Sequence, residues 1–201
     1  MGTTPQTDEE LVEGYLAGRT AAFEELVRRH EGRVYAVCLR MLGREEDARD
    51  AAQDTFLQVL RKLSQFRGDA AFGTWLHRIA VNACYDQLRK KARQPVLHLA
   101  IDEDRGPEPE LGPPVLDHAD GVVGGIDVQR ALLEVPVDFR VVLVLHDVRD
   151  LGYDEIATIL DVPVGTVKSR LHRGRIALGK AMGLTPSGEP GRAARPSEEQ
   201  P

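Results

Sequence analysis

The chain has 201 residues, of which 42% are hydrophobic and 5% aromatic. This length and apolar content allow one medium domain or two small ones, and no run of 18 apolar residues is present that could span a membrane. The net charge of −6 argues against nucleic-acid binding until it is divided by segment, because residues 94–125 carry seven acids and one Arg. That stretch holds the whole acidic excess, so basic surfaces remain possible on both sides of it.

Residues 8–93 have the pattern of a helical domain with four helices. Thr7 and Glu10 are spaced as a capping box, which starts the first helix. Gly43 ends the second, because glycine readily adopts the left-handed conformation that closes many helices, and Thr74 is placed to cap the fourth. The second, third and fourth helices are expected at about 21–42, 45–63 and 74–93.

Residues 94–125 combine prolines, glycines and acids without a helical period, which is typical of a flexible acidic linker. An inert tether is the simplest interpretation of such a composition. Residues 184–201 are also rich in proline and glycine and are expected to form a disordered tail. The N-terminal residues show no basic region followed by an apolar run, so we expect a cytoplasmic protein without membrane insertion.

Residues 126–183 have the pattern of a second helical domain. Its last two predicted helices, about 153–160 and 163–182, are joined by the short turn Asp161-Val162-Pro163, which is helix-turn-helix spacing. Two earlier helices are expected at about 127–133 and 139–147. The sequence therefore predicts an all-α protein, in which two small helical domains are joined by a flexible acidic linker.

The final helix has an apolar side that includes Val167 and Leu171, and an opposite side that is polar and basic. Such a helix, following a compact helix and a tight turn, suits the major groove of DNA. A basic, solvated amphipathic helix is the alternative. The candidate DNA-binding residues on this side are Thr166, Lys168, Ser169, His172 and Arg173.

The predicted helix at 74–93 also has a polar side, which combines guanidinium groups, an amide and two aromatic rings. Guanidinium groups bind phosphates and aromatic rings stack on unpaired bases, so this side is typical of a surface for single-stranded nucleic acid. A lone tryptophan is, however, more often a core residue than a stacking platform. The residues on this side are Trp75, Arg78, Asn82, Tyr85, Asp86, Arg89 and Arg93.

Other classes of function find little support. Cys38 and Cys84 are 46 residues apart, so they form neither a CxxC redox pair nor a zinc cluster, and we expect two buried reduced thiols. The sequence has no HExxH motif, glycine-rich phosphate loop or nucleophile elbow. An enzyme is therefore disfavoured, and no cofactor or metal is expected.

Three segments resemble the extracytoplasmic-function (ECF) subfamily of the sigma-70 family of RNA polymerase sigma factors. EEDARDAAQDTFLQVLRKL (45–63) resembles region 2.2, and FRGDAAFGTWLHRIAVNACYDQLRKK (66–91) resembles regions 2.3–2.4. YDEIATILDVPVGTVKSRLHRGRIAL (153–178) resembles region 4.2, and LHRIAVNAC is similar to an actinobacterial sigma-M-like subgroup. The likeness covers residues 8–93 and 126–182, all except the linker and the tail.

This resemblance implies a transcription initiation factor that binds core RNA polymerase, through its β′ and β subunits, and promoter DNA. It implies that the final helix binds the major groove of the −35 element and that the linker runs towards the polymerase active-site cleft. A cognate anti-sigma factor is also expected. The residues that match the motif for core polymerase are Asp50, Gln53, Asp54 and Phe56. Those expected at the −10 element are Phe66, Arg67, Asp69, Phe72, Arg78, Asn82 and Arg89.

Two positions depart from the family pattern. Gly174 stands where alanine is commoner, and Phe139 stands where a polar residue is usual, which leaves the −35 preference open. The competing hypotheses are a stand-alone helix-turn-helix transcription regulator and a helical adaptor or anti-sigma-like protein. The regulator leaves the helices at 45–63 and 74–93 unexplained, and the adaptor needs no basic reading face.

Overall fold

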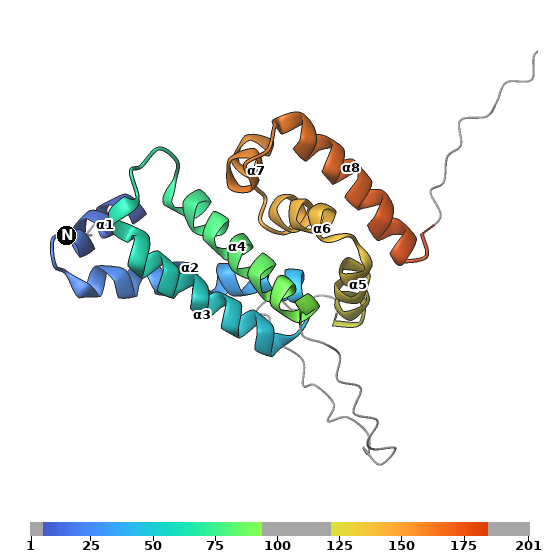
Figure 1. The fold of residues 1–201 in the computed structure, drawn as a ribbon, viewed down its shortest axis with the longest axis horizontal. Coiled ribbons are helices and arrows are strands. Elements are labelled where there is room, and N and C mark those ends of the chain that lie inside the picture. Colours follow the sequence, from blue (N-terminus) through green and yellow to red (C-terminus); the bar gives the residue numbers. More distant parts are fainter. Residues whose placement is uncertain (1–5, 94–121, 185–201) are drawn as a thin grey trace, which may run out of the picture.

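The computed structural model describes residues 6–93 and 122–184, and every regular element in these ranges is helical (Figure 1), which confirms the all-α prediction. The linker and tail predicted at 94–125 and 184–201 lie outside the described residues, except for 122–125 and 184. The N-terminal elements are α1 (Asp8–Leu16), α2 (Thr20–Leu42), α3 (Glu45–Lys62), a 3-10 turn (Leu63–Gln65) and α4 (Phe72–Arg93). The C-terminal elements are α5 (Val122–Glu134), α6 (Val137–Leu143), a π-helical segment (Val144–Val148), α7 (Tyr153–Leu160) and α8 (Val164–Ala181).

α2 is the central helix of the N-terminal bundle, where it packs against α1, α3 and α4. Ala48 and Ala51 of α3 are fully buried, and their small side chains let α3 approach its neighbours closely. Cys38 of α2 and Cys84 of α4 are buried free thiols in the same core, as predicted. The adjacent Cys38 thiol, together with burial, raises the pKa of Cys84, so the thiol rather than the thiolate is the stable form.

Local capping signals define two of the helix ends as predicted. The Thr7 side chain accepts a hydrogen bond from the Glu10 amide at 3.2 Å, and the Glu10 carboxylate accepts one from the Thr7 amide at 2.9 Å. These two bonds complete the capping box of α1. Gly43 follows α2 in the left-handed conformation, with φ of 80°. A side chain would also clash there, because a Cβ on Gly43 would lie 2.4 Å from a methyl carbon of Leu133.

The prediction that Thr74 caps α4 is wrong. The helix begins two residues earlier, at Phe72, and Thr74 lies buried within its first turn. The Phe72 amide donates a hydrogen bond to Glu9 Oε1 of α1 at 3.4 Å. An acid from a distant helix thus satisfies an amide at the start of α4, so a local cap at Thr74 is not needed.

The C-terminal helices extend the same apolar core. All five residues of the run 141–145 are buried, and α8 packs across α6. Gly174 lets the two helices approach closely, because a Cβ there would lie 3.0 Å from Leu143 Cγ and 3.2 Å from the Phe139 carbonyl oxygen. α7 and α8 form the predicted helix-turn-helix, with Asp161 in the left-handed conformation at the turn.

The two groups of helices pack against each other, with α5 beside α2 and α7 beside α4 (Figure 1). The buried Arg140 side chain of α6 donates a 2.6 Å hydrogen bond to the Met41 carbonyl at the end of α2. Gln129 of α5 donates one to the Leu39 carbonyl at 3.1 Å. The last carbonyls of a helix lack partners within the helix, so the Arg140 bond satisfies the Met41 carbonyl from outside. The Leu39 carbonyl already accepts a 2.8 Å bond from the Gly43 amide, and the Gln129 amide adds a second bond to it.

His77 of α4 also links the two groups of helices. Its Nδ1 lies 2.7 Å from the Gly73 carbonyl oxygen and therefore carries the proton, which leaves Nε2 to accept a hydrogen bond from Arg149 Nε at 3.3 Å. Burial lowers the pKa of His77, and Arg149, His30 and Arg33 lower it further, against the bond to Gly73 that raises it. The neutral imidazole is thus the form that fits this interface.

We expect the free energy of unfolding to fall as the pH drops below about 6.5, the ordinary histidine pKa. Unfolded His77 binds a proton there while folded His77 resists it, so the unfolded state holds more protons and stability rises with pH. His77→Gln should flatten this dependence in urea unfolding between pH 7.5 and 5.5. The exposed His172→Gln serves as the control, and an unchanged slope in His77→Gln would contradict the role given to His77.

Candidate nucleic-acid and protein interfaces

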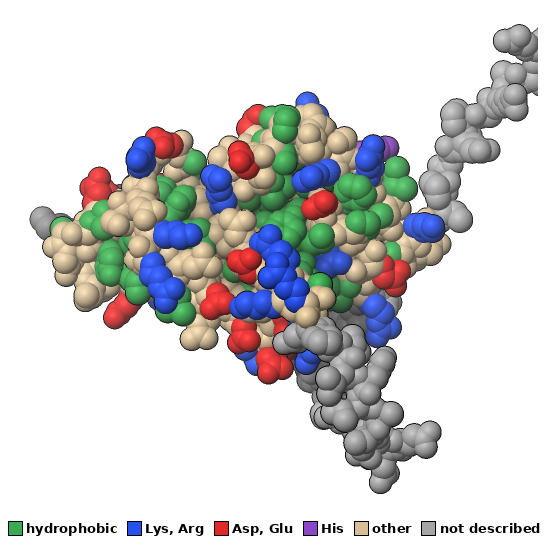
Figure 2. All heavy atoms as spheres, in the orientation of Figure 1, with side chains coloured by type: hydrophobic (Ala, Val, Ile, Leu, Met, Phe, Trp, Pro, Cys, Tyr) green, Lys and Arg blue, Asp and Glu red, His purple; other side chains and the backbone are tan. Residues whose placement is uncertain are grey.

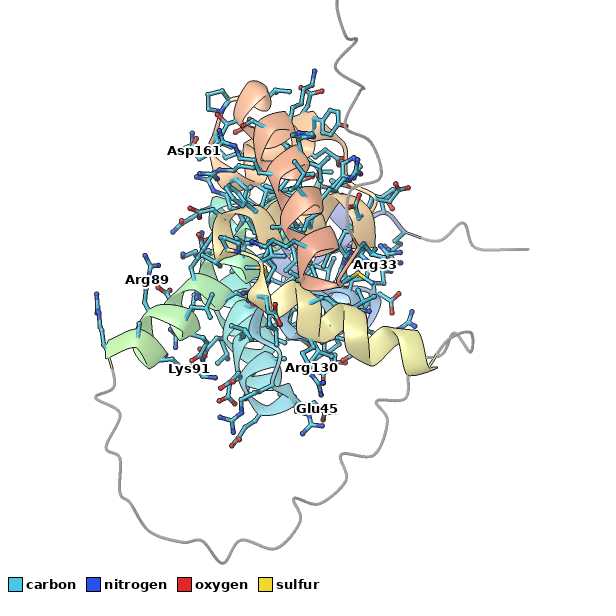
Figure 3. All side chains as sticks on the ribbon, turned by 90° about the vertical axis from the view of Figure 1, so that its right-hand side faces the viewer. Arg33, Glu45, Arg89, Lys91, Arg130 and Asp161 are labelled. Atoms are coloured by element: carbon cyan, nitrogen blue, oxygen red, sulfur yellow. The ribbon has the colours of Figure 1, made fainter. Side chains whose placement is uncertain are left out.

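The polar side of α4 is exposed as the sequence predicts. Arg78, Asn82 and Arg89 are exposed, while Leu76 and Ala80 are buried in the bundle. Figure 2 shows a band of Lys and Arg side chains over the C-terminal half of α4. In Figure 3, Arg89 points away from the helices. This surface therefore has cationic groups and an amide exposed on one helix.

The aromatic residues near α4 form a cluster rather than a row of free rings. The Phe66 ring lies 5.4 Å from Trp75 and 5.7 Å from Phe72, measured between centroids. Phe72 is only 1% exposed, so its ring supports the fold and is not accessible to a base. Phe66 and Trp75 are half-buried, while Arg67 and Asp69 at the tip of the loop are exposed. The cluster therefore positions the loop that carries the predicted −10 contacts.

Side chains of α1 and α2 also stabilise this loop and the start of α4, which the sequence reasoning missed. His30 Nε2 lies 2.6 Å from Asp8 Oδ2, and the His30 ring lies 5.5 Å from Phe72 in an edge-on contact. Nδ1 of His30 is buried and has no hydrogen-bond partner among the residues that the structure describes, so the proton is placed on Nε2, which donates to Asp8. Together with the bond from Phe72 to Glu9, these contacts hold the start of α4 and the loop against α1.

Two polar residues of the α4 face have partners within the chain. Arg89 forms an ion pair with Asp86 at 2.8 Å, and both side chains are more than half exposed. The Tyr85 hydroxyl donates a 3.4 Å hydrogen bond to Asp138 of α6, and burial, together with Asp138, raises the pKa of Tyr85 to about 12. Tyr85 thus lies at the interface between the two groups of helices, whereas Asn82 remains freely accessible.

α3 presents a second exposed surface. Asp50 and Gln53 are exposed and Asp54 is half-buried, but Phe56 packs partly against the core. Leu57 and Leu60, in the next turns of the same helix, are 44% and 40% exposed. The sequence reasoning missed these two leucines. Apolar side chains flanked by acids on one helix face are typical of a protein-docking surface.

The surfaces of α3 and α4 meet in an open groove of about 500 Å³. Asp54, Leu57 and Arg61 line it from α3, and Asp86 and Arg89 line it from α4. At the end of α4, Lys91 forms an ion pair with Asp47 of α3, which fixes the two helices together. The predicted docking face and the predicted single-strand face are therefore adjacent parts of one rigid unit.

The polar side of α8 is exposed as predicted. Lys168, Ser169, His172 and Arg173 are exposed and Thr166 is half-buried, while Val167, Leu171 and Gly174 face the core. Arg175 is also on the surface but forms an ion pair with Asp147 at 2.7 Å. This side of α8 has the donors and positive charge that a major-groove helix needs.

Comparison with known proteins identifies two family regions in the chain. Residues 26–94 match the family Sigma-70 region 2, and residues 126–178 match Sigma-70, region 4. The first match covers most of α2 and all of α3 and α4, and the second covers most of α5 to α8. None of the helices within the described ranges is long and apolar enough to cross a membrane.

Curated relatives carry the same assignment. The chain is 37% identical over 187 residues to the ECF RNA polymerase sigma factor SigM of Mycobacterium tuberculosis, which spans 93% of this chain and 90% of that protein. It is 40% identical over 154 residues to SigE of Mycolicibacterium smegmatis, spanning 77% of this chain and 59% of that protein.

Two solved structures have a fold similar to that of this chain over most of its length. CnrH in complex with the cytosolic domain of CnrY matches with a TM-score of 0.64 and 26% identity, over 89% of this chain and 98% of that one. RpoE of Bartonella quintana, in complex with the anti-sigma factor NepR, has a similar fold with a TM-score of 0.62 over 81% of this chain. The matches to regions 2 and 4 and the likeness to SigM show that the chain belongs to the ECF RNA polymerase sigma factors, which are transcription initiation factors and not enzymes.

Proposed function

We propose that residues 8–93 form the region 2 domain and residues 126–183 the region 4 domain of this sigma factor, each with a defined surface for its target. α3 docks on the β′ coiled coil of core polymerase, through Asp50, Gln53 and Asp54. Leu57 and Leu60 join this surface as apolar contacts. The observation that carries the assignment is the exposure of apolar and acidic side chains together on one face of α3.

The face of α4 and the loop before it read the −10 element. Asn82 is exposed between Arg78 and Arg89, so an unpaired base can meet the amide while the guanidinium groups contact phosphates. Arg67 and Asp69 are accessible at the loop tip. Phe72 is buried and Phe66 packs against it, so in this proposal both rings hold the loop in place rather than contact a base.

α8 reads the −35 element in the major groove, through Lys168, Ser169, His172 and Arg173. Arg173→Ala should lower the affinity of the holoenzyme for a duplex −35 promoter about 5- to 150-fold, because a bidentate arginine–guanine pair provides about 1–3 kcal/mol of discrimination. Competition assays with promoters changed at single −35 positions should show relaxed preference at one base. A uniform loss across all sequences would instead make Arg173 a phosphate contact.

A cognate anti-sigma factor and a cytoplasmic location belong to the same proposal. The similar structures of CnrH and RpoE were solved with the cytosolic domain of CnrY and with NepR, and a partner of this kind is expected here. Core polymerase and promoter DNA place the working protein in the cytoplasm.

Promoter binding with and without core polymerase tests this proposal against a stand-alone regulator. A sigma factor binds promoter DNA tightly only as part of the holoenzyme, whereas a regulator that uses α7 and α8 alone binds without core. A mobility-shift titration on one promoter fragment, with a scrambled fragment as control, separates the two. Equal affinity with and without core would contradict the proposed division of roles.

A further inference from the structure

Lys168 of α8 is in contact with an aromatic ring from the preceding helix, α7. Its ammonium group lies 5.6 Å from the centroid of Tyr153, the first residue of α7. This distance is within the range of a cation–π interaction. Tyr153 is 37% exposed and thus not a core residue. The helix-turn-helix core is instead formed by other buried residues, including Ile156, Ile159, Val167 and Leu171.

The Tyr153 ring is itself held in place by the segment before α7. The His146 ring stacks on it with centroids 5.2 Å apart and an angle of 19° between planes. His146 Nδ1 lies 2.6 Å from Asp147 Oδ1. Asp147 in turn pairs with Arg175 of α8 at 2.7 Å. The contacts therefore run from α8 at position 175, through residues 147, 146 and 153, and back to α8 at position 168.

The two contact points on α8 are seven residues apart, which is close to two helical turns, so both lie along the same side of the helix. A lysine side chain on an exposed helix has many rotamers, and ordering it costs conformational entropy when it binds. A ring that already holds the ammonium group reduces this cost and leaves its hydrogen-bond donors available on the side away from the ring.

We propose that Tyr153, oriented by His146, is a positioning residue that fixes the Lys168 ammonium group for contact with the phosphate backbone of the −35 duplex. The inference rests on the proposed role of α8. Among the predicted −35 contacts, Lys168 is the one with a cation–π contact in the described part of the chain. The expected contribution is small, since an exposed cation–π contact corresponds to about a two- to fivefold effect on affinity.

A double-mutant cycle on holoenzyme binding to a −35 promoter duplex tests this proposal. Lys168→Met should weaken binding and reduce the slope of log affinity against log salt by about one. Tyr153→Leu should weaken binding about two- to fivefold, and the double variant should be no weaker than Lys168→Met alone. Tyr153→Phe keeps the ring and should bind like the parent protein.

Arg173→Ala provides the matched control, because Arg173 is on the same helix and forms no cation–π contact with Tyr153 in the described structure. Its effect should add to that of Tyr153→Leu, and far-UV circular dichroism should be unchanged. If Lys168→Met has no effect, the proposed −35 role of Lys168 fails. If Lys168→Met weakens binding but the effect of Tyr153→Leu adds to it, the positioning role of Tyr153 is overturned and the −35 role of Lys168 stands. An equal loss in Tyr153→Phe would assign the effect to the hydroxyl and also overturn it.

Discussion

Replacing both Asp50 and Asp54 with lysine is expected to lower the affinity for core polymerase at least about 100-fold. The two carboxylates lie one helical turn apart on the outer side of α3, and reversing them places like charges against a surface that binds acids. Like-charge contacts across an interface cost several kcal/mol, and each 1.4 kcal/mol is a tenfold change in affinity. Titration of labelled core with each protein measures the loss.

The matched control reverses two exposed acids elsewhere in the same domain, Glu24 and Glu31 of α2. This variant has the same change in net charge and should bind core within about twofold of the parent. Circular dichroism should show normal helicity for both double variants, because all four side chains lie on helix surfaces. If the Asp50→Lys, Asp54→Lys protein bound core polymerase as tightly as the parent protein, the proposal that α3 forms the docking surface would be contradicted.

Asn82→Ala is expected to reduce open-complex formation about 10- to 100-fold while closed-complex formation and core binding stay nearly intact. Asn82 is exposed on the face of α4 that carries Arg78 and Arg89, and one good polar base contact provides about 1–3 kcal/mol. A surface that binds the unpaired base better than the duplex traps melted DNA. Permanganate reactivity of unpaired thymines measures the open state.

A promoter with a pre-melted bubble should rescue much of the Asn82→Ala defect, because the energy of melting no longer has to be supplied. Lost base selectivity should remain. Gln87→Ala, an amide on another side of the same helix, is the control and should open promoters normally. Asn82 would be only a surface amide if its alanine variant opened a fully duplex promoter as well as the parent protein.

Much of the fold follows from local sequence signals. The capping box at Thr7 and the glycine at 43 define helix ends by bonds and backbone angles within a few residues. Thr74 carries a local capping signal, but the helix begins before it, where the Phe72 amide donates to Glu9, 63 residues earlier in the chain. A cap from a distant helix is a tertiary contact, and a local pattern does not reveal it.

The candidate surfaces were predictable from helical periodicity, and their details were not. Periodicity places Trp75 on the polar side of α4. The Phe66 ring packs against it from the loop before α4, and helical periodicity does not extend to that loop. Leu57 and Leu60 carried a usable signal, because they lie off the buried stripe of α3 formed by Ala48, Ala51, Thr55 and Val59.

Contacts between the two groups of helices lay beyond sequence reasoning altogether. The Arg140 bond to the Met41 carbonyl joins residues 99 positions apart and depends on how two folded units pack. Within the C-terminal group, the contacts from Arg175 to Lys168 depend on how side chains of α8, the π-helical segment and α7 meet, which a local pattern also does not reveal.

Run-off transcription in vitro tests the central claim most directly. Purified core RNA polymerase is combined with this protein and a template that carries its promoter, and transcript length and amount are measured with and without the protein. The expected result is a discrete transcript that requires the protein and is lost in the Asp50→Lys, Asp54→Lys variant. No increase in specific transcripts over core alone, with a protein that binds core normally, would contradict the account.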